Sequence, residues 1–247
     1  MRAESPKSEI PRVTEGLFFT TPPPLPRGPH QLTPDEVVAN HRERVMIAFT
    51  ELVAERGFHD VGVAEIVARS GVSRTAFYRC FENRDACADA AYARFIEVLV
   101  QQMTTRITRT RVSRDIPLIV RAYLDCLSAD LVTARTFQLE FDARGATARR
   151  RRREALTFIA DALRAEHTAL AKTDPTLDPD LAPEVFLAAV YAVRQVASDW
   201  LDADRFDTDR FDADRLDTDR LDADGHVDLT ELEPLLSGWL TRGLQRS

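Results

Sequence analysis

The 247-residue sequence predicts an all-α protein in which an N-terminal three-helix domain is joined by a long fourth helix to a larger helical domain. Three observations support this prediction. Apolar residues recur at three- and four-residue spacings through most of the chain, as they do on one face of a helix. A Gly-Val-Ser turn at 71–73 separates two short patterns of this kind. No segment shows the strict alternation of a half-buried strand.

The composition excludes several classes of protein. The chain is 44% hydrophobic and contains thirteen Pro and nine Gly, which is ordinary for a globular chain with its own core. No apolar run approaches the roughly 18 residues of a membrane span, and no export signal is found at the N-terminus. Cys80, Cys87 and Cys126 fall in helical patterns, so we expect reduced thiols. These features predict a cytoplasmic protein without a membrane partner.

The acidity of the chain is concentrated in one segment. The formal charge is −7, and residues 201–228 alone hold eleven Asp against four Arg. The rest of the chain is therefore neutral overall. The acidic segment can lie away from a DNA-facing surface, so the net charge does not exclude nucleic acid as a partner.

The first helix follows a proline-rich leader. Residues 1–33 have little to bury and carry five Pro between positions 22 and 29, so we expect a disordered leader outside the fold. Thr33 is a suitable N-cap, and Pro34 suits a first helical position. The apolar stripe that follows ends at Gly57, where glycine permits a helix stop.

Two short helices then surround a tight turn. Gly62 and Glu65 form an incomplete capping box, because glycine has no side-chain oxygen. Gly71 supplies a left-handed turn, Val72 fills the angle between the helices, and Ser73 caps a third helix that runs to Phe81. This arrangement is a helix-turn-helix.

The third helix has two chemically different faces. Phe77 and Phe81 lie four residues apart on the inner face. The outer face carries Arg74, Thr75, Tyr78 and Arg79, which suit phosphates and base edges of a DNA major groove. The alternative is a helical corner whose arginines are merely solvated, because helix-turn-helix geometry also occurs away from DNA.

The motifs of this region resemble the N-terminal domain of TetR-family transcriptional regulators. The resemblance is ungapped over about residues 39–95 and rests on Gly57-Phe58, Val63-Ala64-Glu65-Ile66, Ser70-Gly71-Val72-Ser73-Arg74, Phe77-Tyr78, Phe81 and Asn83-Arg84-Asp85. It implies a DNA-binding domain at 34–95 and a ligand-binding and dimerisation domain at 96–247. The positions that it assigns to DNA contact are Ser73, Arg74, Thr75, Ala76, Tyr78, Arg79, Cys80 and Arg84.

The sequence departs from the usual family pattern at several positions. Glycine replaces a threonine or serine at 62, and Cys80 stands where histidine is often found. Alanine is usual at Val67 and Ser70, and Gly and Thr are frequent at Thr75 and Ala76. The operator sequence therefore cannot be predicted. Cys80 suggests a redox hypothesis, in which nearby arginines lower the thiol pKa and Cys87 resolves an oxidised form. The alternative is that Cys80 is a small neutral filler.

The rest of the chain is predicted to be helical. Helix 4 is expected from Asn83 to about Ile107, and later helices at 116–128, 131–143, 147–171, 183–201 and 228–244. No nucleophile and base set, phosphate loop or metal-binding pair is found in a plausible motif. We therefore expect neither an enzyme, nor a cofactor, nor a metal site.

Several aromatic and polar residues are candidates for the lining of an inducer cavity between these helices, which the resemblance implies. Most aromatics at helical spacing belong to a core, so only some of them would touch a ligand. The candidates are Tyr123, Phe137, Gln138, Phe141, Phe158, His167, Phe186, Tyr191 and Gln195. The basic run Arg149–Arg153 is expected to be a solvated face or a partner surface.

The resemblance also implies a homodimer. Its interface would be a four-helix bundle made by the last two long helices, 183–201 and 228–244. The first offers a stripe of small residues and the second offers bulky apolar side chains, which permit close helix packing. Such a dimer would present two recognition helices about one DNA turn apart, which predicts a pseudo-palindromic operator.

A pentad repeat interrupts the second domain at 201–225. Its period of five fits neither an amphipathic helix nor a strand, so we expect a solvated insertion. Residues 222–231 resemble an EF-hand calcium loop from its third position, but Arg220 stands at the first ligand position. We therefore expect no functional calcium site.

The sequence as a whole predicts a dimeric DNA-binding regulator. The favoured function is a repressor that a small-molecule inducer releases from its double-stranded DNA operator. The alternative is a helical calcium- or protein-interaction module that has kept this fold without DNA activity. The two differ in whether Arg74 and Tyr78 matter for binding DNA.

Overall fold

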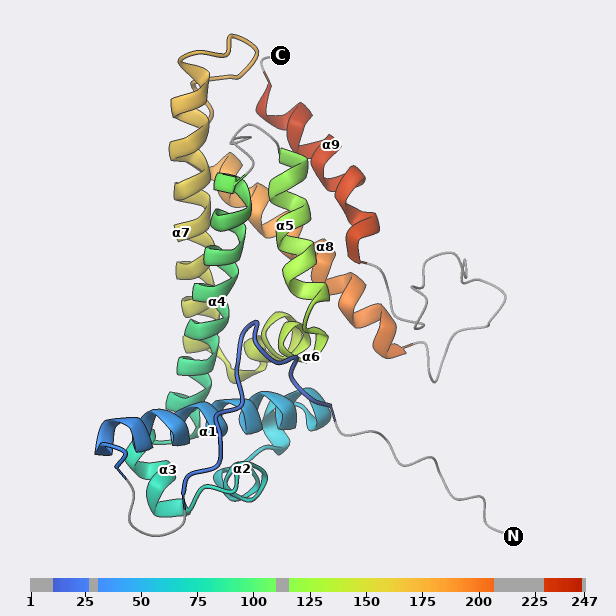
Figure 1. Ribbon diagram of the computed structural model, residues 1–247. Coiled ribbons are helices and arrows are strands. Elements are labelled where there is room, and N and C mark those ends of the chain that lie inside the picture. Colours follow the sequence, from blue (N-terminus) through green and yellow to red (C-terminus); the bar gives the residue numbers. More distant parts are fainter. Residues whose placement is uncertain (1–10, 27–30, 110–115, 207–228, 246–247) are drawn as a thin grey trace.

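The computed structural model describes residues 11–26, 31–109, 116–206 and 229–245 (Figure 1). Within these ranges the protein is helical and contains no β-strand, which confirms the all-α prediction. The helices are α1 Pro34–Arg56, α2 Val63–Ser70, α3 Arg74–Cys80, α4 Arg84–Arg109, α5 Ile116–Ser128, α6 Leu131–Arg135, α7 Ala146–Ala171, α8 Pro183–Phe206 and α9 Glu233–Leu244. Shorter turns are η1 Phe58–Asp60, η2 Thr136–Glu140, η3 Phe141–Arg144 and η5 Leu229–Leu232.

The helices form a small group at one end and a longer bundle above it. Helices α1, α2 and α3 pack together at the base, and α4 rises from them alongside α7 (Figure 1). Helix α8 packs most extensively on α7, and α9 packs on α5. Because α4 touches α1, α5 and α7, it connects the two parts of the molecule.

Local sequence signals set the helix ends as predicted. The Thr33 hydroxyl accepts a hydrogen bond from the Glu36 amide, and the Thr33 amide donates to the Glu36 carboxylate at 2.7 Å. Gly71 ends α2 in the left-handed region at φ 65°, which only glycine adopts without strain. A β-carbon at Gly62 would lie 2.8 Å from the Glu65 carboxylate, which itself accepts from the Gly62 amide at 3.0 Å. A larger residue at this N-cap would therefore have to displace the Glu65 carboxylate, which is the far end of a flexible side chain.

The predicted helix at 131–143 is wrong as a continuous element. It divides into α6, the π-helical turn η2 and the 3₁₀ turn η3. The Thr136 hydroxyl lies 3.0 Å from the carbonyl oxygens of both Val132 and Thr50, so a side chain competes for the backbone ladder at the point where the helix widens. The hydrophobic period alone contains no signal for this contact with α1.

The prediction that residues 1–33 lie outside the fold is wrong for 11–26. Phe18 and Phe19 are each 1% exposed, and the Phe18 ring lies 5.2 Å from the ring of Phe95 in α4. The Pro23 carbonyl accepts from Asn40 of α1 at 2.9 Å. The segment carries two adjacent phenylalanines among its prolines, so it has apolar surface to bury after all.

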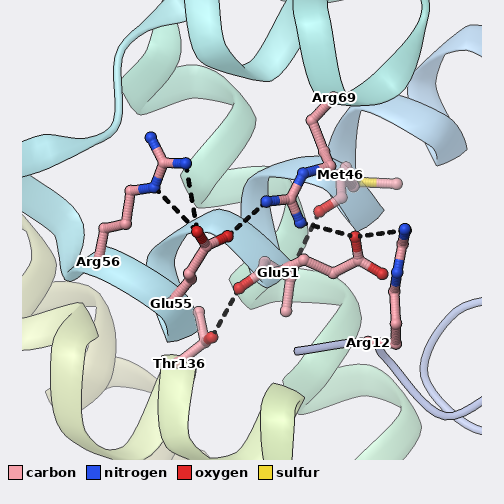
Figure 2. A network of polar contacts seen from close by, with 8 residues as sticks. Arg12, Met46, Glu51, Glu55, Arg56, Arg69 and Thr136 are labelled. Carbon is pink, nitrogen blue, oxygen red and sulfur yellow. Dashed lines mark hydrogen bonds and ion pairs between the residues drawn. The ribbon is translucent and has the colours of Figure 1, made fainter. Parts of the chain in front are cut away.

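A buried polar network ties this segment to α1 and α2 (Figure 2). The Glu51 side chain is 3% exposed and pairs with Arg12 at 3.2 Å and with Arg69 at 3.4 Å. Arg69 also pairs with Glu55, which contacts Arg56 at 3.2 Å. Because these pairs join residues far apart in the sequence, the network fixes how α1, α2 and the N-terminal segment lie together.

Part of the acidic insertion lies outside the described residues. Helix α8 continues five residues past its predicted end at Leu201, through the first pentad, to Phe206. The remaining repeats and the EF-hand-like segment up to residue 228 lie outside the described ranges. The helix predicted from 228 is described from Leu229 as η5 followed by α9.

Candidate nucleic-acid interface and ligand cavity

The inner face of α3 anchors it to the core. Phe77 is fully buried and packs against Phe81, with ring centroids 6.0 Å apart. Val72 is 3% exposed in the turn, and Ile66 of α2 is fully buried. The Ser73 hydroxyl accepts from the Ala76 amide at 3.2 Å, as expected for an N-cap. These contacts hold α3 at a fixed orientation on α1 and α2.

The outer face of α3 is open. Ser73, Arg74, Thr75, Tyr78 and Arg79 are exposed, and Ala76 is half-buried. The Tyr78 side chain is 48% exposed, and the Arg74 guanidinium lies 5.9 Å from the centre of its ring. The exposed face thus offers two guanidinium groups, two hydroxyls and a phenol on one short helix. These groups can donate to phosphates and to guanine edges.

Two residues of α1 extend this basic face, and the sequence analysis did not include them. Arg44 lies beside the turn, since a β-carbon at Gly71 would be 3.1 Å from its Nη2. Burial, followed by the positive charges of Arg44 and Arg79, lowers the pKa of His41. The local field is therefore positive although the chain is acidic. No spacing rule within α3 points to residues of another helix.

Arg84 has a different place from the other predicted DNA contacts. Its Nη1 donates to the carbonyl oxygens of Val61 at 2.9 Å and Phe58 at 3.4 Å, and its guanidinium stacks 4.1 Å from the Phe58 ring. Arg84 therefore holds η1 against the start of α4. A phosphate contact by Arg84 stays a prediction, in competition with these protein contacts.

The placement of Cys80 on the DNA-facing surface is wrong. Its side chain is 8% exposed, and Sγ lies 3.7 Å from the Val38 carbonyl oxygen. Burial raises the pKa of Cys80 more than the charge of Arg42 lowers it, and burial also raises the pKa of Cys87. The redox hypothesis needs a lowered pKa and an accessible thiol, and Cys80 has neither in this structure. All three cysteines are buried, and none of them is in a disulfide.

The upper helices enclose a cavity of about 200 Å³. Its walls come from α4, α5, η2, α7, α8, α9 and the loop between α7 and α8. Most of the lining is aliphatic or aromatic, including Phe95, Leu99, Ile119, Leu163 and Val190. Such a largely apolar interior with few polar groups is typical of a small-molecule site.

Five of the nine predicted lining residues face this cavity, namely Tyr123, Phe137, Gln138, His167 and Phe186. The other four lie elsewhere. The Phe141 ring stacks 3.8 Å from Tyr92 behind the wall, Phe158 is 62% exposed, and Gln195 pairs with Asp199 at 2.6 Å. Tyr191 is half-buried outside the lining. The sequence analysis missed Arg194 and Glu166, which line the cavity.

The helix-turn-helix geometry agrees with a match to a known family. Residues 48–91 match the family model described as bacterial regulatory proteins of the tetR family. Over this segment the chain matches the TetR family. The TetR-family segment contains all of α2 and α3 and the start of α4, so it includes each predicted DNA contact.

A curated relative supports the same assignment. The chain is 29% identical over 90 residues to the HTH-type transcriptional activator FasR of Mycolicibacterium smegmatis. The match covers 36% of this chain and 41% of FasR, so it spans less than half of the relative.

Solved structures extend the likeness to the whole fold. The fatty acid degradation regulator FadR from Bacillus halodurans matches with a TM-score of 0.62 at 19% identity, over 83% of this chain and 97% of that one. FadR from Bacillus subtilis, solved in complex with stearoyl-CoA, matches with a TM-score of 0.55 at 18% identity, over 81% and 98% of the two chains. The helical domain above the TetR-family segment therefore shares the fold of these regulators.

Four of the five arginines at 149–153 are exposed, as expected for a solvated face, and two members of the run also form ion pairs with neighbouring elements. Arg151 pairs with Asp89 of α4 at 3.0 Å, and Arg152 pairs with Asp142 of η3. Arg144 joins the same Asp89 at 2.7 Å. These ion pairs tie η3 and α7 to Asp89 of α4, which lies near the end of the TetR-family segment. The arginines at the start of α7 therefore combine exposure to solvent with ion pairs to neighbouring elements.

Within the described ranges, no group of three or more His, Cys, Asp or Glu side chains is arranged to hold a metal ion. No helix in that part of the chain is both long enough and apolar enough to cross a membrane.

Proposed function

We propose that the chain is a dimeric, ligand-responsive DNA-binding transcriptional regulator that acts as a repressor in the cytoplasm. The proposal rests on one observation above others: the outer face of α3 presents Arg74, Thr75, Tyr78 and Arg79 to solvent in a segment that belongs to the TetR family. Ser73, Ala76 and Arg84 are the further proposed contacts, whereas Cys80 is too buried to be one.

The proposed dimer uses α8 and α9. On α9, Leu235 is 65% exposed and Trp239 is 46% exposed, although both are large and apolar. They lie four residues apart and so share one face of the helix. A two-fold pair of such faces would form a bundle and place two α3 helices to read a pseudo-palindromic operator.

The proposed coupling between ligand and DNA passes through α4. This helix begins directly after α3 and provides Tyr92, Phe95, Leu99 and Met103 to the cavity wall. A ligand that fits one position of α4 better than another would shift the separation of the two reading heads. FadR of B. subtilis was solved in complex with stearoyl-CoA, which supports a regulator of this fold that responds to a ligand.

The test is binding of the purified chain to its own upstream intergenic DNA, compared with unrelated DNA at one fixed, near-physiological salt concentration. We expect sequence-preferring binding that the double variant Arg74→Ala/Tyr78→Ala loses. The matched control is Arg164→Ala, which removes an arginine whose side chain is 48% exposed on α7. Control and wild type should bind alike.

The alternative, a helical interaction module without DNA activity, predicts no preference for any intergenic DNA and no effect of the double variant. The sign of regulation is tested separately with a reporter gene behind the operator found. Because FasR is named an activator, reporter output that rises with the protein would replace the proposed repressor by an activator.

A further inference from the structure

We propose that the cavity binds an elongated apolar carboxylic acid, with the carboxylate held by Arg194 and Tyr123 and the tail between α4 and α7. This proposal names the chemical class of the ligand in the proposed function. Only the regulatory role of the ligand rests on the proposed function, whereas the binding of the acid does not.

Arg194 is a buried cation that has no carboxylate partner among the described residues. It is 8% exposed and lines the cavity from α8. Its Nη2 donates to the Gln138 carbonyl oxygen at 2.8 Å, and its other N–H groups have no acceptor among the described residues. An arginine carries five N–H donors and keeps its charge, and a buried charge is normally paired. A ligand carboxylate in the cavity would supply the missing partner.

A second donor is positioned beside Arg194. The Tyr123 hydroxyl accepts from Gln138 Nε2 at 3.1 Å, so its own hydrogen is free to point to a ligand. The Gln138 side-chain oxygen in turn accepts from the Ser198 hydroxyl at 3.3 Å. Gln138 thus holds Arg194 through its carbonyl oxygen and Tyr123 through its Nε2, and its own side chain is held by Ser198. A charged and a neutral donor held in this way suit the two oxygens of a carboxylate.

The charge surrounding this end is positive. Arg152 lies close by, and burial followed by the charge of Arg194 lowers its pKa. Arg152 pairs with Asp142, whereas Arg194 has no carboxylate within ion-pair distance among the described residues. An anionic headgroup would balance the positive charge of Arg194 and Arg152.

The opposite end of the cavity has the reverse polarity. Glu166 and Asp174 line it there, together with His167, whose Nε2 lies 2.7 Å from the Asp178 carbonyl oxygen. A ligand carboxylate at this end would face like charge. The field therefore orients the acid with its headgroup toward Arg194.

The shape of the cavity fits a chain rather than a compact ring system. On α7 the lining runs from Leu156 through Ile159 and Leu163 to Leu170, a distance of about 21 Å at about 1.5 Å of rise per residue. A volume of about 200 Å³ spread over such a length is narrow. Between the two polar ends the walls are apolar, which suits an alkyl tail.

The test uses calorimetric titration of the full chain with three ten-carbon probes: decanoate, 1-decanol and decylamine. We expect decanoate to bind at least about tenfold more tightly than the alcohol, because it gains a charged hydrogen bond. Saturated acids of eight to sixteen carbons then give the preferred tail length. The proposal is overturned if the alcohol binds as well as the acid, if the amine binds best, or if none of these acids binds.

Variants separate the headgroup contact from the tail contacts. Arg194→Gln should weaken decanoate binding by about 10- to 100-fold and leave decanol binding unchanged. Arg164→Gln on the outside of α7 is the matched control and should change neither. If Arg194→Gln does not fold, Tyr123→Phe should weaken decanoate alone, by a smaller factor. Unchanged decanoate affinity in a folded Arg194→Gln chain would overturn the assignment.

Ligand binding is measured without DNA, and operator binding is measured without ligand. The two can therefore fail separately. If the chain binds the acid but shows no operator binding, the proposed regulatory function is contradicted and the proposed acid site is supported. If the chain binds its operator but none of the acids, only the proposed acid site is contradicted.

Discussion

The outer face of α3 and the wall of the cavity differ in how many segments build them. The outer face of α3 belongs to a single helix of seven residues. The wall of the cavity is built by six helical elements and the loop between α7 and α8. A surface on a single helix follows from residue spacing, whereas a cavity depends on how distant helices meet. The sequence therefore predicts the first far better than the second.

The largest test of this difference separates the two faces of α3. Phe77→Ala should lower the free energy of unfolding by about 3–5 kcal/mol, because Phe77 is fully buried. Tyr78→Ala, one residue on, should change it by about 0.5 kcal/mol or less, because Tyr78 is 48% exposed. Urea denaturation followed by circular dichroism measures both. Equal losses would mean that α3 does not lie as described.

The next test concerns the buried network of Figure 2. Glu51→Gln should lower the free energy of unfolding by about 2 kcal/mol, because Arg69 then keeps a buried charge with one partner fewer. Arg12→Ala should cost about 1 kcal/mol or less, since the Arg12 side chain is 67% exposed. Thermal unfolding of the two variants compares them. A larger loss for Arg12 would contradict the central place of Glu51.

A kinetic test concerns Cys80, which was wrongly predicted to lie on the exposed face of α3. Cys80 and Cys87 should react with iodoacetamide at pH 8 at least about tenfold more slowly in the native chain than in urea, a factor worth about 1.4 kcal/mol. Burial raises both thiol pKa values and so reduces the reactive thiolate below its unfolded level at this pH. Mass spectrometry of the labelled peptides gives the rates. Fast native labelling of Cys80 would restore the redox hypothesis.

The smallest effect is expected at a residue wrongly assigned to the cavity. Phe158→Ser should change the free energy of unfolding by about 0.5 kcal/mol or less and leave decanoate binding unaltered, because Phe158 is 62% exposed. Phe186→Ala is the comparison, since Phe186 is 3% exposed and lines the cavity. It should lower both stability and affinity for the acid and the alcohol alike. Calorimetry and urea denaturation measure the pair.

The features that could be predicted from the sequence are those that nearby residues determine. The bounds of α1, α5 and α7 follow from caps and apolar spacing within one residue or two. The Gly71 turn and the Ser73 cap follow from residue chemistry alone. These signals lie within a few positions of the structure that they determine.

The unpredicted part has causes that lie far away in the sequence. The break after α6 depends on Thr136 meeting Thr50, and the place of Arg84 depends on Val61. Arg194 was missed because a single arginine on an amphipathic helix is usually a solvated charge. Only its position against Gln138 shows that it faces inward. Phe158 was included because an aromatic residue at helical spacing is usually buried.

The N-terminal segment has a practical consequence for anyone who shortens the chain. The Phe18 ring packs against the Phe95 ring of α4, and Phe95 also lines the cavity. A version that starts at α1 would lose the support behind this wall residue and leave part of α4 uncovered. Ligand affinities measured on such a shortened chain would therefore describe a cavity whose wall is less rigid than the wall of the cavity in the full chain.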